Sequence, residues 1–169
     1  MRSRRVLRPA CCWRSSPSAS RTAAPDGLAH AIASDAVKPA VGSIARRSRV
    51  VHARDIELFT AITGDRNPLH YDEEAAARSR FGGLIVQGGV TSGLLNAVVA
   101  EDLPGPGSVF LHVDWSFKAP VRPGDEITAE VQVLEAREDK PLTRLRTTIV
   151  NQDGTVVLDG TALVWTEAL

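Results

Sequence analysis

The sequence is short of cysteine, has no excess charge of either sign and lacks the usual metal-ligand spacings. Its two cysteines, Cys11 and Cys12, are adjacent in a chain of 169 residues, so no disulfide framework is expected and a reducing, cytoplasmic setting is favoured. Lys and Arg number 20 and Asp and Glu number 20, which gives no electrostatic reason to bind nucleic acid or an anionic membrane. No H-x-x-x-H, H-E-x-x-H or Cys/His cluster occurs, so we expect no metal.

One uncharged run has the length of a membrane span but not its composition. Residues 81–100, FGGLIVQGGVTSGLLNAVVA, are 20 residues without a charge. The run holds several glycines and four polar side chains, those of Gln87, Thr91, Ser92 and Asn96. This mixture indicates a loop followed by a helix buried on nearly every side, and we predict no transmembrane segment.

The first 25 residues differ in composition from the rest of the chain. They contain six arginines and five serines, and the first acidic residue is Asp26. Such a leader is typical of an organelle transit peptide, which would make the protein mitochondrial. An unstructured tail, or translation from an upstream start, accounts for the same composition. We therefore expect residues 1–40 to be disordered or leader-like, and residues 41–169 to form a single domain.

Helical periodicity and capping residues mark the first half of this domain. A short strand is predicted over 48–52, followed by a helix over 53–62 in which Ile56, Phe59 and Ile62 form an apolar stripe. Asp72 is the predicted N-cap of a second short helix, which ends at Gly82-Gly83. The buried helix of the uncharged run is expected over about 90–101.

Strict alternation of apolar and polar residues marks the second half. Strands are predicted over 107–118, 127–133, 145–149 and 157–165, with a hairpin turn at Asp153-Gly154. The first of these strands has one predicted buried face, made by Val109, Leu111, Val113, Trp115 and Phe117. Because the strands follow a helix without βαβ alternation, we predict an α+β fold, an antiparallel sheet wrapped around one helix.

The segment TGDRNPLH, residues 63–70, places a carboxylate and an imidazole five residues apart across a stiff bend. Gly64 permits torsions that other residues resist, and Pro68 moves Asn67 out of helical geometry. Such rigidity suits a catalytic pair, Asp65 and His70. The octapeptide alone is equally compatible with a surface turn.

The longer string, Phe59 to His70 followed five residues later by Ala76, resembles the signature of the MaoC-like (R)-specific enoyl-CoA hydratases, also called hydratase 2, and of the related (R)-3-hydroxyacyl-thioester dehydratases. That signature runs aromatic, two variable residues, aliphatic, small, G-D-x-N-P, aliphatic, His, five residues, small. The resemblance continues through FGGLIVQGG, LPGPGSVFL and SFKAPVRPGDEITAEV and covers roughly residues 45–165. It implies a single hotdog fold with a long central helix, and a homodimer with active sites near its interface.

The resemblance also implies a reaction and its residues. The family hydrates a trans-2-enoyl thioester to an (R)-3-hydroxyacyl thioester, and Asp65 and His70 fall on its catalytic dyad. An Asp–His pair that holds one water can both activate it and supply a proton. The backbone N–H of Gly88, at the start of the central helix, is implied as the donor to the thioester oxygen. Asn67, Gln87, Gly89 and Asn96 are assigned to substrate binding.

One position departs from the family pattern, and the sequence leaves alternative functions open. Many family members read I-V-H-G-M where this chain has IVQGG, so Gln87 cannot titrate. A hotdog thioesterase, or a catalytically silent protein that binds acyl thioesters, is the alternative function. The substrate carrier is coenzyme A or acyl carrier protein, and no other cofactor is expected. Four cationic side chains could contact the phosphates of the carrier, although each is more typical of an ordinary charged residue on a protein surface. They are Arg78, Arg80, Lys118 and Arg122.

Overall fold

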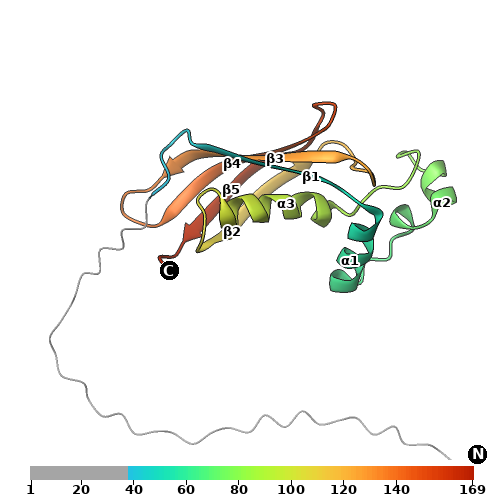
Figure 1. Ribbon diagram of the computed structural model, residues 1–169, viewed down its shortest axis with the longest axis horizontal. Helices are drawn as coiled ribbons and strands as arrows, with labels where there is room; N and C mark the ends of the chain where they lie inside the picture. The colour runs from blue at the N-terminus through green and yellow to red at the C-terminus, as the bar shows by residue number, and fades with distance from the viewer. Residues whose placement is uncertain (1–37) are drawn as a thin grey trace, which may run out of the picture. The chain divides into compact units, whose positions relative to one another are not determined.

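The computed structural model describes residues 38–169. Most of the predicted leader-like segment, 1–40, therefore lies outside the described residues. The helices and strands are β1 (Ile44–Val50), α1 (Ala53–Thr63), the short 3-10 helix η1 (Pro68–His70), α2 (Glu73–Arg78), α3 (Gly88–Glu101), β2 (Ser108–Phe117), β3 (Glu126–Ala136), β4 (Leu142–Asn151) and β5 (Val156–Thr166). Figure 1 shows α3 lying along one face of the sheet, with α1 and α2 beyond one end of it.

The five strands form one antiparallel sheet in the order β1-β3-β4-β5-β2. Period-two alternation decides which side of each strand is buried. In β3, for example, Ile127, Ala129, Val131 and Val133 are buried beneath α3, while the residues between them are less buried. The predicted α+β arrangement, a helix against an antiparallel sheet, is confirmed.

Helix α3 fills the core because its side chains are apolar or small on almost every side. Its buried residues are Thr91, Leu94, Leu95, Val98 and Val99. At its C-terminal end the Asp102 carboxylate pairs with the Arg47 guanidinium of β1, with 2.9 Å between Arg47 Nη2 and Asp102 Oδ1. This hydrogen-bonded ion pair holds the pKa of Asp102 below its usual value. Within residues 38–169, no helix combines the length and the apolar character needed to cross a membrane.

Several boundaries differ from the predicted ones. The first strand is Ile44–Val50, earlier in the chain than the predicted 48–52, because its ladder with β3 begins at the Ile44–Gln132 pair. Asp72 caps α2 as predicted, its Oδ1 accepting from the Ala75 N–H at 2.9 Å, but this helix ends at Arg78, before the glycines. Helix α3 begins at Gly88, two residues before the predicted start.

The predicted buried face of the 107–118 strand is wrong for the single chain at four of its five residues, while Trp115 is partly buried against the core as predicted. A register shift lies between Phe110 and His112, where Leu111 forms a bulge. A bulge exchanges the two faces of a strand, so Phe110 turns inward and packs edge-on against Trp115, with 5.6 Å between ring centroids. Strand β2 also lies at the edge of the sheet. The bulge accounts for the exposed fractions of Val109, 54%, and Leu111, 55%, and the edge position accounts for those of Val113, 40%, and Phe117, 56%.

The pairing of β2 with β5 depends on a glycine. Gly160 faces Trp115 across the ladder, and a Cβ added at Gly160 would overlap the backbone oxygen of Asp114 and lie 3.0 Å from the Trp115 Cα. Neither atom can move without separating the strands. We expect Gly160→Ala to lower the free energy of unfolding by about 3 kcal/mol.

Urea unfolding at fixed protein concentration measures this loss. Thr161→Ala, one residue away on the same strand, is the control and should change stability much less. Equal stability of the Gly160→Ala variant and the unaltered protein would contradict the close approach of the two backbones.

Candidate active site

The bend that carries the acid and the imidazole is built by hydrogen bonds that backbone N–H groups donate to a carbonyl and to two side chains. Gly64 ends α1 in the left-handed conformation, at φ 78°, and its N–H donates to the Thr60 carbonyl at 2.8 Å. The Asn67 N–H donates to Asp65 Oδ1 at 3.1 Å, and the Asn67 Oδ1 accepts from the Leu69 N–H at 3.1 Å. Asn67 thus closes the turn through its side chain and caps η1. Its assignment to substrate binding stays a prediction.

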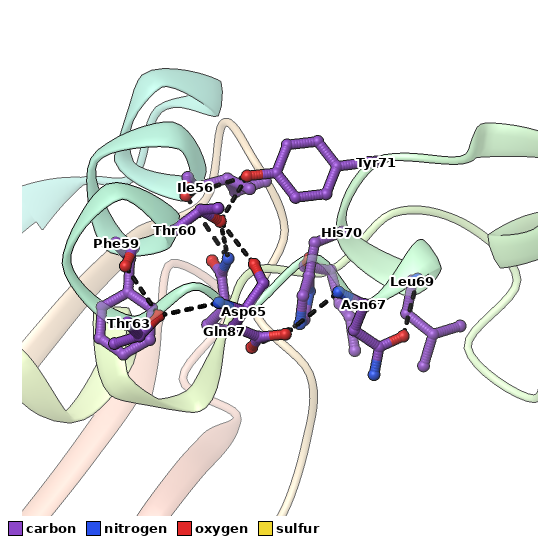
Figure 2. Close-up of polar contacts among 11 residues, drawn as sticks. Ile56, Phe59, Thr60, Thr63, Asp65, Asn67, Leu69, His70, Tyr71 and Gln87 are labelled. Atoms are coloured by element: carbon purple, nitrogen blue, oxygen red, sulfur yellow. Dashed lines mark hydrogen bonds and ion pairs between the residues drawn. The ribbon is translucent and has the colours of Figure 1, made fainter. Parts of the chain in front are cut away.

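Asp65 and His70 lie side by side but form no direct hydrogen bond. The distance from His70 Nε2 to Asp65 Oδ2 is 3.5 Å, which is too long for one. The His70 side chain is 8% exposed and that of Asp65 is 39% exposed, so the pair lies partly sheltered at a surface. The two predicted catalytic side chains are therefore neighbours that face one another (Figure 2).

The other ring nitrogen of His70 fixes the tautomer of the neutral imidazole. Nδ1 lies 2.8 Å from the Ile85 carbonyl oxygen, and a carbonyl only accepts, so Nδ1 carries the proton. Nε2 then presents a lone pair toward Asp65. The Ile85 N–H donates in turn to the Leu69 carbonyl at 3.2 Å. This second bond joins η1 to the segment that leads into α3.

Thr60 connects the acid-bearing bend to the start of α3. Its hydroxyl donates to the Asp65 carbonyl at 2.6 Å and accepts from Gln87 Nε2 at 3.1 Å. The Tyr71 hydroxyl also bonds the Thr60 hydroxyl. Figure 2 shows these dashed contacts converging on Thr60. The hydroxyl has one proton and two lone pairs, and all three are used.

This arrangement fixes the orientation of the Gln87 amide. The amide nitrogen faces two acceptors, Thr60 Oγ1 at 3.1 Å and the Ile56 carbonyl at 3.4 Å, so the nitrogen and oxygen are not interchangeable. Gln87 is 2% exposed. Its Oε1 is buried without a hydrogen-bond partner among the described residues. The Gln87 side chain joins α1 to the N-cap of α3, and its assignment to substrate binding stays a prediction.

Sequence reasoning missed Thr60 and Tyr71, and it misplaced the buried face of α1. The predicted stripe included Ile62, which is 83% exposed, whereas Ile56 and Thr60 are buried. Ile62 follows Ile56 by six residues, about 240° around a helix, so the two cannot share a face. The signal that could have found Thr60 was its i, i+4 spacing from Ile56.

The first turn of α3 offers free backbone donors. Among residues 38–169, nothing accepts a hydrogen bond from the N–H of Gly88 or of Gly89. A Cβ at Gly88 would lie 3.1 Å from Phe117 Cζ, and one at Gly89 would overlap the ring of Phe59. Two aromatic rings therefore pack closely against this turn. The predicted role of Gly88 is compatible with its free N–H.

The remaining predicted residues and grooves add little to this site. Asn96 is exposed on α3, and its side chain has no hydrogen-bond partner within the described range, so its role stays a prediction. A groove beside the β3–β4 hairpin, lined in part by Arg137 and Trp165, contains none of the predicted site residues. Groups of three or more possible metal ligands are not found in residues 38–169.

Comparison with known proteins agrees with this architecture. The chain matches the family model for the MaoC like domain over residues 37–154. It is 43% identical over 124 residues to the (R)-specific enoyl-CoA hydratase of Aeromonas caviae, covering 73% of this chain and 92% of that protein. It is 45% identical over 114 residues to the 3-hydroxybutyryl-CoA dehydratase of Methylorubrum extorquens, covering 68% of this chain and 72% of that protein.

A solved structure gives the same result. The (R)-hydratase from A. caviae involved in PHA biosynthesis matches with a TM-score of 0.73 and 41% identity, over 76% of this chain and 98% of that one. Together with the sheet and helix described above, this likeness defines a hotdog-fold hydro-lyase of the enoyl-thioester hydratase and 3-hydroxyacyl-thioester dehydratase type. The chain belongs to the MaoC-like family, and the predicted family, fold and enzyme class are confirmed.

The Thr60 hydroxyl gives a testable requirement of the site. In Thr60→Val the buried Gln87 amide loses its nearest acceptor and the Asp65 carbonyl loses a donor. We expect Thr60→Val to lower the free energy of unfolding by about 2 kcal/mol. Thr60→Ser keeps the hydroxyl and should retain most of the stability. Denaturant unfolding measures both variants, and equal losses would contradict a role for the hydroxyl.

Proposed function

We propose that the chain catalyses the reversible hydration of a trans-2-enoyl thioester to an (R)-3-hydroxyacyl thioester, with Asp65 and His70 as the groups that activate water. One observation carries the proposal: Asp65 Oδ2 and His70 Nε2 lie 3.5 Å apart, and because Nδ1 of the neutral ring donates to the Ile85 carbonyl, Nε2 is an acceptor as the carboxylate oxygen is. Two acceptors cannot bond one another without a proton between them. A water molecule that donates one hydrogen to each satisfies both.

The same arrangement explains how that water would react. With both hydrogens held, the lone pairs of its oxygen are free to attack C3 of the enoyl group. As the C–O bond forms, one proton passes from the water to the Asp65–His70 pair, and the pair returns a proton to C2. The elements of one water are thereby added across the double bond. In the reverse direction the pair removes the C2 proton and releases the C3 hydroxyl as water.

The charge that develops on the thioester oxygen needs a donor. The N–H of Gly88 is free and lies at the N-terminus of a helix of 14 residues, where the helix dipole favours negative charge. The Gly89 N–H is a second donor in the same turn. No cofactor is required by this scheme, in which coenzyme A or acyl carrier protein only carries the acyl group.

Removing either member of the pair should abolish most of the activity. We expect Asp65→Asn and His70→Ala each to lower kcat for hydration of crotonyl-CoA by about a hundredfold or more, because an amide cannot take a proton from the reacting water and alanine has no imidazole to hold it. The measurement is the loss of enoyl absorbance, with free thiol followed in parallel.

The matched controls are an acid and a histidine outside the pair. Asp72→Asn should retain activity because asparagine caps α2 as well as aspartate does, and His52→Ala should retain it because that side chain is exposed. Thiol release without hydration by the unaltered protein would instead support a thioesterase. Full activity in both pair variants would exclude the proposed mechanism.

We also propose that the active form is a homodimer joined along β2. The two edges of the sheet differ in character, since β1 carries Arg46, Arg47 and Arg49 whereas β2 exposes apolar side chains. Charged residues protect a sheet edge, and an apolar edge strand favours pairing with another chain. A second copy of this chain, with its own β2, supplies a matching edge.

Two edge variants test the dimer. Val113 is 40% exposed on β2 and Val50 is 43% exposed on β1, so the same substitution can be placed on either edge. We expect Val113→Lys to convert the dimer to a monomer in sedimentation experiments, and Val50→Lys to leave it intact. A monomeric unaltered protein, or a dimeric Val113→Lys variant, would contradict the proposal.

A further inference from the structure

We infer that Arg80 and Lys118 form a cationic pair that binds a phosphate of the substrate's phosphopantetheine carrier. The inference rests on the proposed function, since it concerns the end of the thioester substrate remote from the reacting carbons. It assigns a binding role to side chains that lie outside the Asp65–His70 pair.

The pair lies in a groove that contains the proposed oxyanion donor. This groove has about 780 Å³ of empty volume, part of it open to solvent, and Gly88 and Phe117 are among its lining residues. Its charged lining residues are Arg80 and Lys118, and none of its lining residues is acidic. The groove is therefore positively charged although the whole chain carries no net charge. A positively charged groove concentrates anionic ligands.

Arg80 and Lys118 differ from two nearby arginines, Arg78 and Arg122, whose guanidinium groups already have partners within the protein. Arg78 forms an ion pair with Glu74 one turn away on α2. The Arg122 guanidinium donates to the carbonyl of Leu84 at 3.1 Å and also to the carbonyl of Phe81, so it serves the backbone. Within residues 38–169, neither Arg80 nor Lys118 has a carboxylate partner, and their charges remain available.

Both cations are attached to backbone that the fold holds in place. The Lys118 N–H donates to the Val157 carbonyl at 2.9 Å, directly after the end of β2. The Arg80 guanidinium carbon lies 5.3 Å from the centroid of the Phe81 ring, and Arg122 bonds the Phe81 carbonyl. A cation–π contact orients the guanidinium while leaving its N–H groups free for an acceptor.

Phosphate is the anion that fits this chemistry. A guanidinium offers paired donors that match phosphate oxygens, and an ammonium adds a compact positive charge. In the proposed reaction the substrate is uncharged at its reacting end and anionic only at its carrier end. Cations in a groove that also holds Gly88 would therefore bind the carrier rather than the acyl chain.

Three thioesters with the same acyl group test this role. They are crotonyl-CoA, S-crotonyl-4′-phosphopantetheine and S-crotonyl-pantetheine, the last of which has no phosphate. We expect Arg80→Ala combined with Lys118→Ala to raise KM for crotonyl-CoA about tenfold or more, with kcat nearly unchanged. The same double variant should leave the kinetics of S-crotonyl-pantetheine as they are in the unaltered protein.

Controls separate charge from structure. Arg80→Lys with Lys118→Arg keeps both charges and should restore most of the lost affinity, while Arg78→Ala should have no effect. The inference would be overturned if the Arg80→Ala, Lys118→Ala variant lost activity equally on all three substrates. It would also be overturned if this variant lost activity on none of them. An effect on both phosphorylated substrates assigns the pair to the phosphate next to pantetheine, and an effect on crotonyl-CoA alone assigns it to the other phosphates of coenzyme A.

Binding measured without turnover distinguishes this inference from the proposed function. Calorimetric titration with free coenzyme A and with pantetheine reports on the cations even if the protein hydrates no enoyl thioester. Weaker binding of coenzyme A by the double variant, with binding of pantetheine unchanged, supports the pair. Equal binding of coenzyme A by the double variant and the unaltered protein would overturn the inference, whatever the hydration assay shows.

Discussion

The hydrogen bond from His70 Nδ1 to the Ile85 carbonyl is the constraint on which the site depends. At 2.8 Å the single N–H of the neutral ring donates to the backbone carbonyl, so Nε2 is an unprotonated acceptor beside Asp65. With the opposite tautomer, Nε2 would donate to the carboxylate directly and the two groups would have no need of a water between them. The chemistry of the pair is thus set by a carbonyl fifteen residues away in the chain.

That carbonyl is useful only because the segment containing it is fixed. The Ile85 N–H donates to the Leu69 carbonyl, next to His70 in the chain, and the Val86 N–H donates to the Val121 carbonyl at 2.8 Å. On the other side of the pair, Thr60 and Gln87 join α1 to the start of α3. The bend over 63–70 is therefore held from both directions, and these outside contacts add to the hydrogen bonds within the bend in fixing the Asp65–His70 pair.

The features that sequence predicted well are those encoded by neighbouring residues. Capping by Asp72, the turn at Asn67 and the alternation of β3 each depend on spacings of a few residues, and all appear in the structure. The family signature is equally local, so it located the bend and the two side chains within it.

The features that sequence missed depend on distant partners. The bulge at Leu111 is visible only in the pairing of β2 with β5, and it reverses a face that strict alternation had predicted. In the sequence Thr60 cannot be told from an ordinary helical threonine, because its hydrogen-bond partner Gln87 lies 27 residues later. An edge position for β2 is likewise a property of sheet order, which spacing along the chain does not contain.

Gln87 shows how a departure from the family pattern can be accommodated without moving the chemistry. Where many relatives carry a histidine, this chain has an amide that turns its nitrogen toward two acceptors on α1, Thr60 Oγ1 and the Ile56 carbonyl. An amide nitrogen has two hydrogens and can serve both acceptors, whereas a neutral imidazole has one N–H in total. Glutamine therefore suits a position whose neighbours are acceptors. It cannot transfer a proton at neutral pH, and the proton steps of the proposed reaction are left to Asp65 and His70.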